Sequence, residues 1–112
     1  MRLKTIRADD TIKHIALHGR LDIKGVTDIQ YDFMQETTVG PRPTVVDISK
    51  VTFISSLGIG MLVSAAKHME KRGARMVLLN PTELVRSTLE TSYLNELIPI
   101  VSSESAALEL LR

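Results

Sequence analysis

The chain of 112 residues contains no cysteine and no tryptophan, and it has only two tyrosines and two phenylalanines. Without cysteine there is no disulfide framework, no thiolate nucleophile and no thiolate metal site. The few aromatic side chains disfavour a surface that binds nucleic acid by stacking on bases. No apolar run reaches the roughly 18 residues of a membrane span, and the N-terminus has no apolar signal region. We therefore expect a cytoplasmic protein with no membrane span.

The chain also has no large excess of positive or negative charge. The chain has 14 basic and 13 acidic residues, which are interspersed, and its formal net charge is +1. Long-range attraction to nucleic acid is therefore weak, and we expect no nucleic-acid partner. Hydrophobic residues make up 44% of the chain, which is enough for a compact core without metal or disulfide support. We predict a single domain over residues 1–112.

Apolar periodicity predicts the element order ββαβαβαβα. Residues 3–8 and 11–19 form an N-terminal hairpin, and Val26, Ile29 and Phe33 recur at the spacing of a surface helix. The alternation after the hairpin implies crossover connections. The predicted fold class is therefore α/β, with a mixed, mostly parallel sheet of about five strands and about four packed helices.

The later elements have clear boundary signals. Residues 75–79 read as a buried strand, after which Asn80 is placed to cap a helix that has Pro81 at its first position and Glu83 beyond it. Residues 97–101 form a last short strand. Ser102 or Ser103 then caps a C-terminal helix.

The segment from Thr44 to Gly73 is the most informative part of the chain. It predicts a buried strand at residues 44–47, a short polar loop, and a helix from Ser56 to Arg72. The turn into the helix falls between Phe53 and Gly60. The residues expected to pack against the sheet are Ile59, Leu62, Val63, Ala66 and Met69. Free N–H groups and a partial positive charge mark a helix N-terminus, so Ser55 and Ser56 are placed to cap the helix or to carry a phosphoryl group.

Three motifs are similar to those of the STAS family of bacterial anti-sigma factor antagonists. They are GRLD at residues 19–22, VVDIS at 45–49 and VTFISSLGIGMLVSAAK at 51–67. The resemblance covers nearly the whole chain and implies a STAS-like fold. The family typically carries D-S-S-G-L-G, and the serine before the first glycine is phosphorylated.

The sequence departs from that motif and allows two alignments. Alignment on Gly58 and Gly60 places Ser55 at the family's aspartate, Ser56 at its first serine and Leu57 at its phosphoacceptor. Alignment on the serine pair makes Ser56 the acceptor, with Ser55 the second choice, and treats Leu57 as an inserted residue.

The resemblance implies a partner-switching protein that regulates transcription. Its partner is a kinase-type anti-sigma factor, which it binds to release sigma factor, and a serine phosphatase reverses the phosphorylation. The partner supplies ATP and Mg²⁺, so this chain needs no cofactor. The partner-binding residues are predicted to be Asp22, Asp47, Ser55, Ser56, Leu57, Gly58 and Gly60. The alternative is a STAS interaction subunit of a signalling or transport complex that is not phosphorylated, which the Leu57 alignment favours.

Catalysis is not expected. The GxSxG elbow is absent, no histidine has a motif that ties it to Ser55 or Ser56, and a serine without a base is a poor nucleophile. Asp47 is expected to organise the loop before the helix or the environment of the serine. Nucleotide and metal sites are not expected either: Val63 stands where a dinucleotide motif needs its third glycine, and His14, His18 and His68 are scattered.

Two glycines in the first turns of the helix imply a close approach by other atoms. Each costs the helix up to about 1 kcal/mol relative to alanine. We expect packing within the domain to account for Gly60, and a partner to approach Gly58.

Overall fold

The fold begins with the predicted N-terminal hairpin. In the computed structural model, which describes residues 1–112, β1 (Arg2–Ala8) pairs antiparallel with β2 (Lys13–Leu21). Asp9 organises the turn, because its Oδ1 accepts hydrogen bonds from the hydroxyl of Thr11 at 2.7 Å and from the backbone N–H of Ile12 at 3.0 Å. These bonds, led by that of the Thr11 hydroxyl, hold the pKa of Asp9 well below its usual range.

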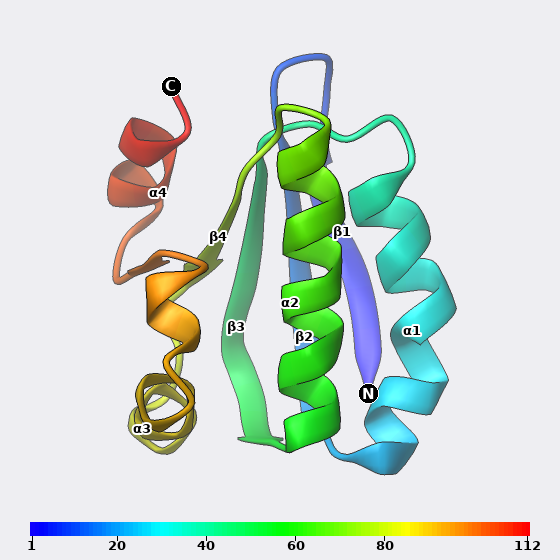
Figure 1. Cartoon of the computed structure of the whole chain (residues 1–112), viewed down its shortest axis with the longest axis vertical. Coiled ribbons are helices and arrows are strands. Elements are labelled where there is room, and N and C mark those ends of the chain that lie inside the picture. The colour runs from blue at the N-terminus through cyan, green and yellow to red at the C-terminus, as the bar shows by residue number, and fades with distance from the viewer.

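Five strands form one sheet in the order β1-β2-β3-β4-β5, and every pair after the hairpin is parallel. The elements that follow β2 are α1 (Ile23–Thr38), β3 (Thr44–Ile54), α2 (Ser56–Lys71), β4 (Met76–Leu79), α3 (Glu83–Thr91), the 3₁₀ turn η1 (Leu94–Glu96), β5 (Ile100–Val101) and α4 (Glu104–Leu110). Helices α1 and α2 lie side by side over one face of the sheet (Figure 1). The predicted fold class and element order are confirmed.

Strand β3 is longer than the sequence predicts. The prediction of a strand at residues 44–47 followed by a polar loop is wrong, because β2 provides a parallel partner for β3 as far as the pair Leu21 and Ile54. Two register shifts, each with an extra residue in β3, lie in this stretch, whose polar residues are Asp47, Ser49, Lys50 and Thr52. Between those polar residues, Ile48 and Val51 point into the core and are buried.

Helix α2 begins at Ser56 as predicted, but its buried face differs in part from the prediction. Met61 and Ala65 are fully or almost fully buried together with the predicted Leu62 and Met69. The predicted core residues Ile59, Val63 and Ala66 are only half-buried. The physical reason is an open pocket beside η1, which Val63 and Ala66 line, so this flank of the helix has no neighbour that covers it fully.

Helix α3 begins later than predicted. Its N-cap is Thr82, whose hydroxyl accepts a hydrogen bond from a backbone N–H of the first turn at 3.3 Å. Asn80 is not the cap, because its backbone N–H donates to the carbonyl of Val101 at 2.7 Å and so extends the pairing of β4 with β5. A positive φ of 55° at Asn80 then turns the chain, and Pro81 leads into the helix.

The hydrophobic core lies on both faces of the sheet. The larger cluster fills the space between the sheet and the helices α1, α2 and α3, and it includes the predicted α1 residues Val26, Ile29 and Phe33. A smaller cluster packs under α4 on the opposite face and comprises Ile12, Val45, Val77, Leu79 and Ala107. No helix has the length and apolar character that crossing a bilayer requires.

Candidate functional site

The carboxyl ends of β2 and β3 lie next to each other, because these strands are parallel and Leu21 pairs with Ile54. Helix α1 follows β2 almost directly and α2 follows β3, so both helix N-termini lie at the same edge of the sheet (Figure 1). The first turn of each helix presents N–H groups without intrahelical partners and the positive end of the helix dipole. Most of the site residues that the sequence predicts lie at this edge.

Ser55 connects the start of α2 to the end of β2. It is the N-cap of α2, and its Oγ accepts a hydrogen bond from the backbone N–H of Gly58 at 3.2 Å. The same hydroxyl donates to the carbonyl of Leu21 at 2.8 Å, and the backbone N–H of Ser55 donates to that carbonyl at 2.9 Å. Ser55 is half-buried, and its hydroxyl both donates and accepts a hydrogen bond within the chain.

Ser56 has the opposite environment. The hypothesis that it caps the helix is wrong, because Ser55 occupies the capping position and Ser56 is the first helical residue. The side chain of Ser56 is exposed, and the hydrogen bonds that organise this turn leave its hydroxyl without a partner. Leu57 follows it and is 49% exposed, although it is apolar. Ser56 and Leu57 are therefore both accessible to another molecule.

The expectation that packing within the domain accounts for Gly60 is wrong, and such packing is found at Gly58 instead, where a partner was expected. A Cβ atom at Gly58 would lie 2.9 Å from the carbonyl oxygen of Leu21 and 3.1 Å from a side-chain carbon of Ile54, so packing within the chain requires glycine there. Gly58 is buried. A Cβ atom at Gly60 would meet nothing within 4 Å, and Gly60 is exposed. Only Gly60 leaves open space for another molecule.

Asp22 performs at α1 the task that Ser55 performs at α2. It is the N-cap of α1, and its Oδ1 accepts a hydrogen bond from the backbone N–H of Gly25 at 2.9 Å. Arg20 Nε lies 3.3 Å from the other carboxylate oxygen. The Gly25 hydrogen bond, with a smaller contribution from Arg20, lowers the pKa of Asp22.

Arg20 and Phe53 also belong to this edge, although the sequence does not indicate them. They pair across β2 and β3, and the Arg20 guanidinium lies 4.5 Å from the centre of the Phe53 ring. A cation at this distance from a ring face is attracted to it. This contact depends on the register of β2 against β3, and that register is known only from the structure.

Asp47 lies away from the helix starts. It is within β3, where its Oδ1 accepts a hydrogen bond from the backbone N–H of Ser49 at 2.9 Å. At about 3.3 Å per residue, the seven residues from Asp47 to Ile54 separate it from the serine pair by roughly 23 Å along the strand. The structure therefore does not place Asp47 in the environment of the serines. It stabilises a register shift of β3 instead.

No histidine lies beside Ser56. His68 is in the last turn of the same helix, about 18 Å along its axis at 1.5 Å per residue, and its Nδ1 contacts the carbonyl of Ser64 at 2.8 Å. His14 and His18 lie on one face of β2, which is the face opposite to the helix α2. No group of three His, Asp or Glu side chains is close enough to hold a metal ion.

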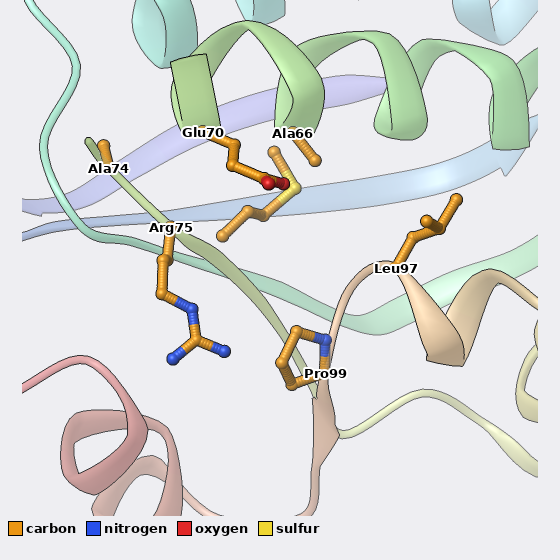
Figure 2. Close-up of a pocket in the computed structure, with 7 residues that line it drawn as sticks. Ala66, Glu70, Ala74, Arg75, Leu97 and Pro99 are labelled. Atoms are coloured by element: carbon orange, nitrogen blue, oxygen red, sulfur yellow. The ribbon is translucent and has the colours of Figure 1, made fainter. Parts of the chain in front are cut away.

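A pocket of about 330 Å³ lies between the C-terminal half of α2 and the segment that leads into β5 (Figure 2). Ala66, Leu97 and Pro99 give it apolar walls, and Glu70 and Arg75 supply the charges. In Figure 2 the Glu70 and Arg75 side chains extend in different directions, so the two charged groups do not converge on one point. This arrangement does not form an acid–base pair, and the start of α2 remains the candidate site.

Comparison with known proteins identifies the family. The model of the STAS domain matches residues 4–107. The chain belongs to the STAS domain family. A STAS-domain-containing protein of Pseudomonas aeruginosa is 30% identical over 93 residues, which cover 83% of this chain and 91% of that protein. An anti-sigma F factor antagonist of Lysinibacillus sphaericus is 26% identical over 93 residues, which cover 82% of this chain and 80% of that protein.

Solved structures show the same fold. The structure of the Bacillus cell fate determinant SpoIIAA in the phosphorylated form matches this STAS domain with a TM-score of 0.72 at 21% sequence identity, covering 99% of this chain and 100% of that chain. The family resemblance of the sequence motifs is thereby confirmed, as is the STAS-like fold that it implies.

Proposed function

We propose that this STAS domain is an anti-sigma factor antagonist that works by partner switching. In the unphosphorylated form it binds a kinase-type anti-sigma factor through the surface around the start of α2, which releases sigma factor for transcription. The partner phosphorylates Ser56, and a serine phosphatase restores the binding form. The observation that carries the proposal is the exposed, unpaired hydroxyl of Ser56 at the first position of α2. The name of the Lysinibacillus sphaericus relative supports the class of partner.

The surface around Ser56 has the composition of a small interface. Leu57 is 49% exposed, and Ile23, the first residue of the neighbouring α1, is 72% exposed. Burial of such side chains against a partner removes apolar area from water and stabilises the complex. Gly60, one turn further along α2, leaves room for a partner's backbone to approach. Ser56 therefore lies where an added charge would meet the partner directly.

The charge of a phosphoryl group explains how the switch works. Phosphoserine carries about −1.5 to −2 charges at neutral pH. In the free protein the N–H groups and the dipole at the start of α2 stabilise this charge. In a complex the same charge must be desolvated next to Leu57 and the apolar groups that cover it, which is unfavourable. Phosphorylation should therefore weaken binding without unfolding the protein.

The proposal gives this chain no catalytic role and no cofactor. A serine hydroxyl is a weak nucleophile unless a base activates it, and the nearest histidine along α2 is His68 in the last turn. We propose that the kinase partner supplies the ATP, the Mg²⁺ and the base for phosphoryl transfer. Ser56 is then the substrate of that reaction.

Phosphopeptide mapping tests the site. The wild-type protein, Ser56→Ala and Ser55→Ala are incubated with the cognate kinase and ATP. The label should appear on Ser56 in the wild type and in Ser55→Ala, and Ser56→Ala should stay unlabelled. Label on Ser55 alone would move the acceptor to the capping residue and would contradict the proposal.

A second candidate function is favoured by Leu57. In the alignment on Gly58 and Gly60 this exposed leucine stands at the phosphoacceptor position of the family. A side chain without a hydroxyl at that position fits a STAS subunit that binds its partner in a signalling or transport complex without phosphorylation. No label on any serine, with a kinase that is active on another substrate, would support this function over the switch.

A further inference from the structure

One face of the sheet is only partly covered by helices. Along β2, Ile15, Leu17 and Leu21 are buried in the core that faces α1 and α2. Side chains alternate along a strand, so His18 and Arg20 point to the opposite face. On that face the only packed helix is α4, which covers the small cluster around Val45, Val77 and Leu79 near β4. The part of the face formed by β1, β2 and the second half of β3 has no helix over it.

This uncovered area is called the open face, and the strand register assigns its residues. Arg2 pairs with His18, and His18 pairs with Lys50, so these three form one row across β1, β2 and β3. Lys4 lies in the next row, and Arg20 pairs with Phe53 at the other end. Adjacent strands are about 4.8 Å apart, so each row of three brings its side chains within about 10 Å. The open face is defined by Arg2, Lys4, His18, Arg20, Lys50 and Phe53.

The open face concentrates positive charge in a chain that is close to neutral as a whole. Four of its six residues are lysine or arginine, whereas the formal net charge of the whole chain is only +1. Asp47 is the acidic residue that the register places in the row of Lys4. The ion pairs of the chain use Arg20 but not Arg2, Lys4 or Lys50. These three exposed cations therefore have no partner within the molecule.

Protection of a sheet edge does not explain this arrangement. Charged side chains on an edge strand prevent pairing with other chains, and β1 is an edge strand. Arg20 and Lys50, however, lie on β2 and β3, which are interior strands. The positive charges therefore extend across interior strands of the sheet. Charges that only protect an edge would be confined to the edge strand.

We propose that the open face binds an acidic segment of a partner protein, at a surface separate from the Ser56 switch. The charges of the open face complement carboxylates, and such complementarity accelerates and orients association. Single-stranded nucleic acid fits less well, because the Arg20 guanidinium lies over Phe53, the one phenyl ring there, at 4.5 Å and would block base stacking on that ring. A lipid surface fits less well because none of the six residues is an exposed apolar side chain that could insert.

Titration of the ¹⁵N-labelled full chain by NMR tests the proposal. The probe is a peptide of alternating glutamate and serine, which presents its carboxylates on one side when extended. The peptide should shift the amide signals of residues 2–4, 16–20 and 47–53, and the shifts should weaken as salt is added. The variant Lys4→Glu/Lys50→Glu should lose at least about tenfold in affinity. The matched control Lys67→Glu/Lys71→Glu makes the same change of charge on exposed positions of α2 and should bind within about twofold of wild type.

Three results would overturn the proposal. The first is equal loss of affinity in both charge-reversed variants, because binding would then follow the net charge and not the open face. The second is stronger binding of a thymidine oligonucleotide or of phosphatidylserine vesicles than of the peptide. The third is a set of shifts on the open face that depends on protein concentration without peptide, since the partner would then be a second copy of the chain. Unchanged amide spectra away from the mutated positions would show that each variant is folded.

Discussion

Replacing each of the two glycines in the first turns of α2 by alanine should change stability in opposite directions. Alanine is favoured over glycine inside a helix by about 0.5 to 1 kcal/mol. At Gly60 nothing lies within 4 Å of the added Cβ, so Gly60→Ala should gain this amount in full. For a domain of this size, 1 kcal/mol raises the melting temperature by about 4 °C.

At Gly58 the same change should be unfavourable. The added Cβ would lie 2.9 Å from the Leu21 carbonyl oxygen and 3.1 Å from Leu21 Cβ and Ile54 Cγ1. Forcing an extra methyl group into packed surroundings costs about 1 to 3 kcal/mol. This cost exceeds the helical gain, so Gly58→Ala should lose about 1 kcal/mol and differ from Gly60→Ala by about 2 kcal/mol.

Urea unfolding followed by circular dichroism measures both variants against the wild type. The expected order of the free energy of unfolding is Gly60→Ala, wild type, Gly58→Ala. A Gly58→Ala protein as stable as the wild type would show that the start of α2 does not approach the end of β2 this closely. The reasoning on Ser55 and Leu21 would then fail as well, because it depends on the same contact.

Three further predictions concern stability. Leu62→Ala, at a fully buried position, should lower the free energy of unfolding by about 2 to 5 kcal/mol, and the exposed Lys67→Ala by less than about 0.5 kcal/mol; equal losses in urea would mean a different orientation of α2. Ser55→Ala should cost about 1 kcal/mol as a lost cap, and Ser56→Ala less than about 0.5 kcal/mol; the reverse order would contradict the assignment of the cap. The lowered pKa of Asp22 adds stability that is present above about pH 4 and is lost as the pH falls through that pKa. Asp22→Asn keeps a capping side chain and should lose less stability on acidification than the wild type, and identical pH profiles would refute this role.

Local patterns predict most of the fold. Val26, Ile29 and Phe33 form a buried stripe because residues three and four apart lie on the same face of a helix. The order of strands and helices follows from the same kind of pattern together with the rule that parallel strands need crossover connections. The length of β3 could not be predicted this way, because its polar second half is strand only where β2 lies beside it.

Details of the candidate site depend on contacts between distant residues. Ser55 and Ser56 are adjacent, and either is a good cap by residue type. The choice falls on Ser55 because the carbonyl of Leu21, 34 residues earlier, accepts its hydroxyl. The same end of β2 packs so closely against residue 58 that only glycine fits there, and it does not reach Gly60. Asp47 lies apart from the serine pair for a related reason, since the distance along β3 appears only with the full strand.

Calorimetry with two variants of Ser56 tests the proposed switch most directly. Ser56→Asp adds a negative charge where the helix dipole favours it, so the variant should remain folded. It should bind the cognate anti-sigma factor at least about tenfold more weakly than wild type, which corresponds to about 1.4 kcal/mol. Ser56→Ala should bind nearly as the wild type does. Equal affinity of the two folded variants would contradict an electrostatic switch at Ser56.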